Sequence, residues 1–405
     1  MTVAEPVRTP VESPPASDGL GLGLRALTRL LEEHSAPYGF VSLLLAGSLA
    51  RGEGSRLLTP AGPKPFNDID LVLVTERPVP AAVVSAWEGE ATRLVAPDSS
   101  YSGGCLSPLG LHADLAVLPR QRLRRLPRTM FNFDLKSARV LAGDNVLREM
   151  PSFRPADIPA REALALLGNR CLSMCESAGE PEAGTALWMY YHSLKAIIDS
   201  GAALLMLSGR YRTPHQEQVS RLRDVVRRDY PSLLARWPHL IDMVEAAVVE
   251  RRRLRPDVKW AEAVVRWKEA RGVILQTLRC ALARVLGVSE HAPWAELTTG
   301  MRRWWTSLDA LLEGRRLPVA AAQWGALRTV RRPRRLWAQA AVHVAAPHLL
   351  LAIEPRGKSP PEYQHDLALA ASYLAEVSGG SPATGRDGDW RPVRDAVVGR
   401  WKGIA

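Results

Sequence analysis

Two short stretches decide the fold of this 405-residue chain: residues 47–55, GSLARGEGS, and residues 67–74, NDIDLVLV. The first follows an apolar run at 39–46, GFVSLLLA, and the second contains another at 69–75, IDLVLVT. Short runs of β-branched and leucine residues bounded by Gly, Pro or Asn are typical of buried strands. The pattern therefore predicts a strand, a tight polar turn, a spacer and a second strand.

The second predicted strand begins with two acidic residues, Asp68 and Asp70. Alternate positions of a strand share a face, so we expect both side chains to point the same way while the residues between them enter the core. Adjacent carboxylates repel each other unless a hard cation lies between them, and oxygen ligands of this kind suit Mg²⁺ that accompanies nucleotide phosphates. Asp114 lies in a third apolar run, LHADLAVL at 111–118. Three such residues on adjacent strands could hold two metal ions for an in-line phosphoryl displacement.

The turn after the first predicted strand has the composition of a phosphate site. Gly47 allows a close approach of the backbone to a ligand, and the helix start that follows would present free N–H groups to a phosphate. Ser48 adds a hydroxyl donor there, and Arg51, one turn further on, adds a charged fork.

With these residues the chain resembles the nucleotidyltransferase superfamily typified by DNA polymerase β, and most closely the minimal and antibiotic-modifying nucleotidyltransferases. In that family a GSxARG segment precedes a (S/N)DIDL strand, as GSLARGEGS and NDIDLVLV do here. The resemblance covers about residues 38–118 and continues more weakly through 135–147 and 190–212. The spacer between Ser48 and Asp68 is longer than in the minimal enzymes.

The resemblance implies an α+β fold, a short mixed sheet flanked by helices and followed by a helical region. The implied activity is transfer of a nucleoside monophosphate from an NTP to an acceptor hydroxyl, with release of pyrophosphate. Gly47 and Ser48 would hold the β- and γ-phosphates, and Asp68 and Asp70 would bind Mg²⁺. Asp114 would complete the metal site or help to deprotonate the acceptor.

Two residues of a later predicted helix have alternative interpretations. Lys195 lies between Leu194 and Ala196, one turn after Tyr191. Its ammonium group either stabilises the charge of a phosphate in the transition state or extends from the helix surface into solvent. Tyr191 either stacks on the nucleotide base or packs in the core, and an aromatic residue at helical spacing more often does the latter.

The pattern predicts a succession of segments along the chain. Residues 1–18, rich in proline, form a disordered leader, residues 19–150 the catalytic domain, residues 151–290 a helical domain that completes the active site, and residues 291–405 a helical region of unknown role. Helical spacing predicts helices over residues 20–33, 80–95, 157–178, 182–208, 214–228, 231–253, 257–286, 293–312, 317–345 and 361–377, with a last short helix near 401.

Charge and cysteine content bear on partners and compartment. The formal charge is +11, and because residues 1–150 carry equal numbers of basic and acidic residues, the whole excess lies in residues 151–405. This disfavours a cationic acceptor and favours a neutral or anionic one. Arginines beside tryptophans are compatible with nucleic-acid binding, but we favour helix packing for them. Four scattered cysteines argue against a disulfide framework, and no stretch is apolar for the length of a membrane span, so we expect a cytoplasmic protein.

These observations favour a Mg²⁺-dependent nucleotidyltransferase that moves a nucleoside monophosphate, with AMP as the first choice, from an NTP to a hydroxyl of a small molecule. One alternative is a nucleotide-binding regulatory protein, such as a sensor or an antitoxin-like partner, that keeps the fold without turnover. Others are a nucleotidyltransferase that acts on RNA or protein, and an RNA-binding helical scaffold. The pattern does not specify the acceptor or the oligomeric state.

Overall fold

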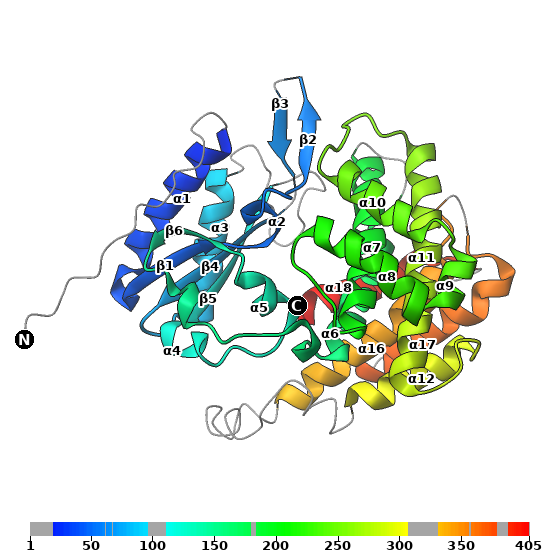
Figure 1. Cartoon of the computed structure of the whole chain (residues 1–405). Helices are drawn as coiled ribbons and strands as arrows, with labels where there is room; N and C mark the ends of the chain where they lie inside the picture. Colours follow the sequence, from blue (N-terminus) through cyan, green and yellow to red (C-terminus); the bar gives the residue numbers. More distant parts are fainter. Residues whose placement is uncertain are drawn as a thin grey trace, which may run out of the picture. The chain divides into compact units, whose positions relative to one another are not determined.

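The computed structural model describes residues 19–60, 62–66, 68–95, 111–179, 184–306, 331–355, 358–378 and 388–404. The chain divides into two compact units, and each is described by itself (Figure 1). The first unit comprises residues up to Phe153 together with Arg252–Pro256, and the second comprises Arg154–Arg251 and the residues from Asp257 onward. The predicted leader at 1–18, Asn67 and Cys105 lie outside the described residues.

The first unit contains a mixed four-stranded sheet in the order β5-β4-β1-β6. Strand β1 (Phe40–Leu45) pairs antiparallel with both β4 (Asp68–Thr75) and β6 (Arg139–Gly143), whereas β4 and β5 (His112–Pro119) are parallel. Strands β1, β4 and β5 confirm the three predicted strands. Strand β6 was not predicted, because its five residues are half-buried or exposed and carry no alternating pattern.

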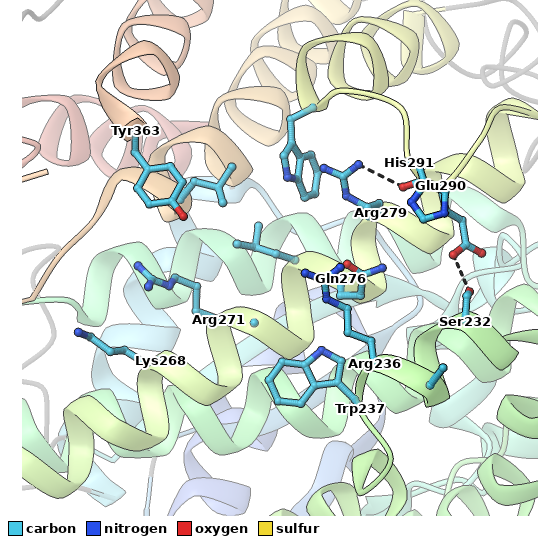
Figure 2. A pocket seen from close by; sticks show the side chains of 15 residues that line it. Ser232, Arg236, Trp237, Lys268, Arg271, Gln276, Arg279, Glu290, His291 and Tyr363 are labelled. Atoms are coloured by element: carbon cyan, nitrogen blue, oxygen red, sulfur yellow. Dashed lines mark hydrogen bonds between the residues drawn. The ribbon is translucent and has the colours of Figure 1, made fainter. Parts of the chain in front are cut away.

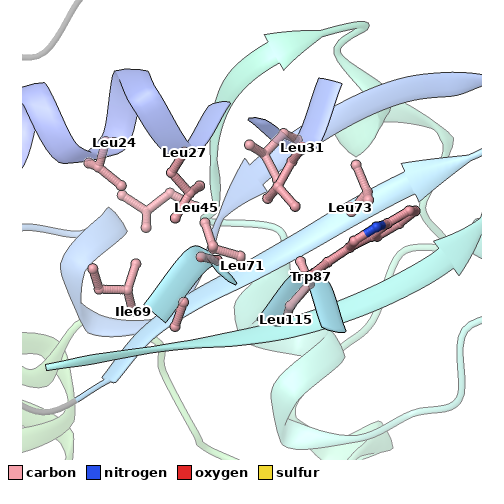
Figure 3. Close-up of a cluster of buried hydrophobic side chains, with 12 residues drawn as sticks. Leu24, Leu27, Leu31, Leu45, Ile69, Leu71, Leu73, Trp87 and Leu115 are labelled. Carbon is pink, nitrogen blue, oxygen red and sulfur yellow. The ribbon is translucent and has the colours of Figure 1, made fainter. Parts of the chain in front are cut away.

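Apolar side chains cover both faces of this sheet. Helices α1 (Gly19–Ser35) and α3 (Ala81–Val95) contribute Leu24, Leu27, Leu31 and Trp87 to a cluster that includes Ile69, Leu71 and Leu73 of β4 (Figure 3). The opposite face packs Val72 and Val74 against residues of the short helices α4 (Arg120–Leu123) and α5 (Met130–Leu135). Alternation along β4 therefore places Asp68 and Asp70 on the same face as Val72, at the start of the strand.

The spacer between the two motif stretches is a hairpin. After the single turn α2 (Gly47–Ala50), strands β2 (Arg56–Thr59) and β3 (Gly62–Pro65) pair antiparallel as a separate two-stranded sheet. Leu254 adds to it: the Leu58 N–H donates to the Leu254 carbonyl and the Leu254 N–H donates to the Arg56 carbonyl, both at 2.8 Å. The sequence pattern did not predict that the chain is extended at Leu254, because this residue lies in the short interval between two predicted helices, 231–253 and 257–286.

The second unit is helical. Its helices are α6 (Ala160–Ser177), α7 (Thr185–Leu207), α8 (His215–Asp229), α9 (Pro231–Arg236), α10 (Leu240–Arg251), α11 (Trp260–Leu286), α12 (Trp294–Thr306), α16 (Arg331–Ala352), α17 (Gln364–Ser378) and α18 (Arg391–Ile404). Short 3₁₀ turns are η1 (Ala36–Tyr38) and η2 (Val146–Glu149) in the first unit, and η3 (Pro155–Asp157) and η4 (Pro361–Tyr363) in the second. Helix α7 is buried along most of its length and packs against α6, α8, α10 and α11.

One predicted helix is wrong. The span 231–253 forms two helices, α9 and α10, with a break at Trp237 and Pro238. Proline has no N–H to donate and its ring clashes with the preceding turn, so the helix ends before it and a new one begins at Leu240. In the predicted spans 293–312 and 317–345, residues 307–330 lie outside the described residues. Among the residues described, no helix is long and apolar enough to cross a membrane.

Candidate functional site

The three predicted carboxylates come together on neighbouring strands. The parallel register of β4 and β5 places Asp70 opposite Asp114 and Asp68 opposite His112. One oxygen from each of Asp68, Asp70 and Asp114 lies within 4.8 Å of the other two. Three hard oxygen donors converging in this way are a suitable ligand set for Mg²⁺, which prefers carboxylates and phosphate oxygens.

The three side chains differ in their access to solvent. Asp68 and Asp70 are half-buried, whereas the Asp114 side chain is 53% exposed. His112, two residues before Asp114 on the same face of β5, places Nε2 3.4 Å from Asp114 Oδ1 and is the more buried of the two. The carboxylates therefore repel one another from partly desolvated positions, and a bound cation would offset that repulsion.

The turn at Gly47 lies directly against this cluster. Gly47 has φ +64°, in the left-handed region, and a Cβ added there would stand 2.8 Å from Asp70 Cγ and 3.2 Å from Asp70 Cβ. The Ala46 N–H also donates to the Asp70 carbonyl at 2.8 Å. Both the conformation and the space at position 47 thus require glycine, and the turn and the carboxylates form one structure.

Ser48 and Arg51 follow within a few residues. Ser48 is half-buried in the single helical turn α2, and its carbonyl accepts a 2.8 Å hydrogen bond from the Glu53 N–H. Arg51, predicted as a fork for phosphate, directs Nε to Glu53 Oε2 at 3.0 Å. Its Nη1 is buried and has no hydrogen-bond partner among the described residues.

Glu53, at the end of the Gly47 turn, joins two arginines in this unit. Its side chain is buried, and while Oε2 accepts from Arg51, Oε1 accepts from Arg252 at 3.1 Å. A glutamate between two glycines carries no periodic signal, and Arg252 is 199 residues away. The ion pair holds the end of the Gly47 turn to the segment that extends the β2–β3 hairpin.

Lys195 and Tyr191 belong to the helical unit, on α7. Tyr191 is buried, stacks on Trp188 with ring centroids 5.7 Å apart, and has Lys195 Nζ 5.5 Å from its own centroid. The buried position favours the packing interpretation of Tyr191. The role of either residue toward a nucleotide stays a prediction.

Comparisons with known proteins found similarity to solved structures. No family model matches the chain, and no curated protein matches it. A solved structure that is similar is the crystal structure of spectinomycin adenyltransferase AAD(9) from Enterococcus faecialis with ATP and spectinomycin. The two chains are 10% identical, the match covers 64% of this chain and 98% of that one, and the TM-score is 0.39.

Proposed function

We propose that the chain is a Mg²⁺-dependent nucleotidyltransferase that transfers a nucleoside monophosphate, AMP in the first instance, from an NTP to a hydroxyl of a small-molecule acceptor. The observation that carries the proposal is the convergence of Asp68, Asp70 and Asp114 within 4.8 Å beside a glycine turn that only a residue without a Cβ can occupy. The resemblance of the GSLARGEGS and NDIDLVLV stretches to the nucleotidyltransferases supports the same reaction.

Each part of the site has a proposed task. Asp68, Asp70 and Asp114 would hold Mg²⁺, which when bound neutralises charge on the phosphate oxygens. Gly47 and Ser48 would bind the β- and γ-phosphates through backbone N–H groups and the Ser48 hydroxyl. Asp114, the most exposed of the carboxylates, would accept the proton of the acceptor hydroxyl.

The acceptor is proposed to be neutral or anionic. The excess positive charge of the chain lies entirely in residues 151–405, and it would repel a polycationic acceptor. Cys171, Cys175 and Cys280 are buried free thiols, which supports a reducing compartment and hence a cytoplasmic enzyme.

The test is turnover with each of the four α-labelled NTPs, Mg²⁺ and a panel of hydroxyl acceptors. We expect pyrophosphate release and a labelled product with the wild type, and neither with the double variant Asp68→Asn/Asp70→Asn. Asp144→Asn is the matched control, because it removes a surface carboxylate of the same unit that pairs with Arg120. Nucleotide binding without turnover in the wild type would favour the regulatory alternative, and equal turnover in the double variant would refute the proposal.

A further inference from the structure

The helical unit contains a cavity of about 650 Å³ that is separate from the three carboxylates (Figure 2). Its floor is one face of α11, whose lining residues recur at helical spacing: Lys268, Arg271, Gly272, Leu275, Gln276 and Arg279. Its walls come from α9 and the Trp237 that follows it, from residues 290–294 and from Tyr363 of η4. A cavity of this size is suitable for a small organic ligand.

Positive charge dominates the lining. Arg236, Lys268, Arg271 and Arg279 face one acidic residue, Glu290, whose carboxylate accepts a 2.6 Å hydrogen bond from the Ser232 hydroxyl. Lys268 pairs with Glu354 at 2.9 Å. Among the described residues no carboxylate forms an ion pair with Arg236, Arg271 or Arg279. The cavity therefore carries an excess of cationic groups that an anionic ligand would neutralise.

Two of these arginines are held in place by backbone carbonyls. The Arg271 Nη1 donates to the Ile353 carbonyl at 2.7 Å, and the Arg279 Nη1 donates to the Glu290 carbonyl at 3.1 Å. Burial lowers the pKa of both guanidinium groups, and the charge of Arg236 lowers that of Arg279 further. The backbone carbonyls are neutral and do not cancel the positive charge of these two groups, and at Arg271 the charge of Glu354 opposes the effect of burial on the pKa. The hydrogen bonds hold both guanidinium groups in position for an anion.

Aromatic rings form the rest of the lining. Gly272, in the middle of α11, has no side chain to separate the helix from Trp237: a Cβ there would stand 2.6 Å from Trp237 Cζ2. Arg279 lies over the ring of Trp294, 4.6 Å from its centroid. Tyr363 lies on the other side of the cavity (Figure 2). These rings offer apolar surface to a planar group beside the cationic one.

We propose that this cavity binds a small organic phosphate that carries a planar ring, with the phosphate at Arg236 and Arg279 and the ring against the aromatic walls. Guanidinium groups match the geometry of phosphate oxygens, and Arg236 and Arg279 lie close enough to repel each other, which a shared anion would relieve. The site belongs to the helical unit and does not depend on nucleotidyl transfer.

The test is calorimetric titration of the full chain with 1-naphthyl phosphate, with 1-naphthol and inorganic phosphate as probes of each half of the ligand. The titrations contain a chelator of divalent cations. Without a bound metal ion, the carboxylates of Asp68, Asp70 and Asp114 repel the phosphate, so the proposed metal site does not contribute to the binding that is measured. We expect saturable binding of 1-naphthyl phosphate, with 1-naphthol and inorganic phosphate each weaker by about tenfold or more.

Two variants locate the site without removing a group that supports the fold. Arg236→Gln changes an exposed side chain, and Gln276→Trp fills the cavity while leaving every charge in place. Each is expected to weaken binding by about tenfold or more. Arg223→Gln, an exposed arginine on α8, is the control for net charge, and unchanged melting temperatures show that the variants fold.

Three results would overturn the proposal: no binding of 1-naphthyl phosphate up to about 1 mM, equal binding of 1-naphthol, or affinities of Arg236→Gln and Gln276→Trp that match that of Arg223→Gln.

Discussion

The carboxylate of Asp70 occupies the space that the first side-chain atom of any residue other than glycine would need at position 47. This contact joins two stretches of sequence that are separated by a hairpin, and it makes the shape of the turn depend on the position of a proposed metal ligand. The backbone of the turn therefore packs directly against the Asp70 carboxylate, and the φ of Gly47 lies in the left-handed region.

The first prediction concerns Gly47→Ala. A Cβ at this position must displace the Asp70 carboxylate in addition to imposing strain at positive φ. We expect nucleotidyl transfer to be abolished and the free energy of unfolding to fall by clearly more than the ~1 kcal/mol that a left-handed backbone alone costs alanine. Chemical denaturation and the turnover assay measure the two effects.

Gly52→Ala provides the matched control. Gly52 has a similar φ of +70°, but nothing lies within 4 Å of the Cβ that would be added. The free energy of unfolding of Gly52→Ala should fall only by the ~1 kcal/mol that backbone strain costs, and the variant should keep its activity. Equal losses in the two variants would show that strain, and not the contact with Asp70, explains the glycine.

The second prediction concerns the two ion pairs of the buried Glu53 side chain. Glu53→Gln leaves Arg51 and Arg252 without their shared carboxylate. The Arg252 side chain is 40% exposed, so the loss comes chiefly from the pair with Arg51, which is 12% exposed, and breaking a buried pair of this kind costs about 3 kcal/mol. Glu76→Gln is the control, since Glu76 pairs with Arg120 but its side chain is 56% exposed, and such pairs contribute less than ~1 kcal/mol. Urea denaturation compares them, and a loss for Glu53→Gln no larger than that for Glu76→Gln would contradict the bridging role.

The third prediction is a pH dependence of stability that arises from His343. This histidine is buried in the helical unit, its Nε2 lies 2.9 Å from Asn169 Oδ1, and burial lowers the pKa of His343 to about 4. The unfolded chain, with a pKa near 6.5, binds a proton that the folded chain does not, so stability is complete above pH 6.5 and is lost as the pH falls toward 4.

The measurement is the free energy of unfolding of His343→Gln and wild type at pH 7 and pH 5. From pH 7 to pH 5 the titration of His343 should lower the free energy of unfolding of the wild type by roughly 2 kcal/mol. The variant should not show this part of the decrease. His239→Gln, which changes a histidine that is 84% exposed, should keep the wild-type dependence. An undiminished pH dependence in His343→Gln would contradict the assignment.

Local patterns predicted the elements that carry the proposed chemistry. Short runs rich in apolar residues identified β1, β4 and β5, and alternation along β4 placed Asp68 and Asp70 on one face. The proximity of Asp114 to Asp70 depends on the parallel register of β4 and β5, which no local pattern specifies. The same holds for Glu53 and Arg252, whose contact joins residues that are distant along the chain.

Elements with weak patterns were missed for a physical reason. The two strands of the β2–β3 hairpin contain exposed and half-buried residues, with two prolines in β3, so they have neither an apolar run nor a period. The cavity in the helical unit is assembled from α9, α11, the residues before α12 and η4, and only packing brings these together. Helix periodicity predicted α11 but not which of its faces would remain uncovered.

The most direct test of the central claim is divalent-cation binding, because it needs no knowledge of the acceptor. Mn²⁺ can be followed by electron paramagnetic resonance in the presence of ATP, with Mg²⁺ as competitor, for the wild type, Asp70→Asn, Asp114→Asn and Asp144→Asn. The account predicts saturable Mn²⁺ binding that Mg²⁺ displaces, weakened by about 100-fold in Asp70→Asn and Asp114→Asn and unchanged in Asp144→Asn. Equal Mn²⁺ affinity in all four proteins would contradict it.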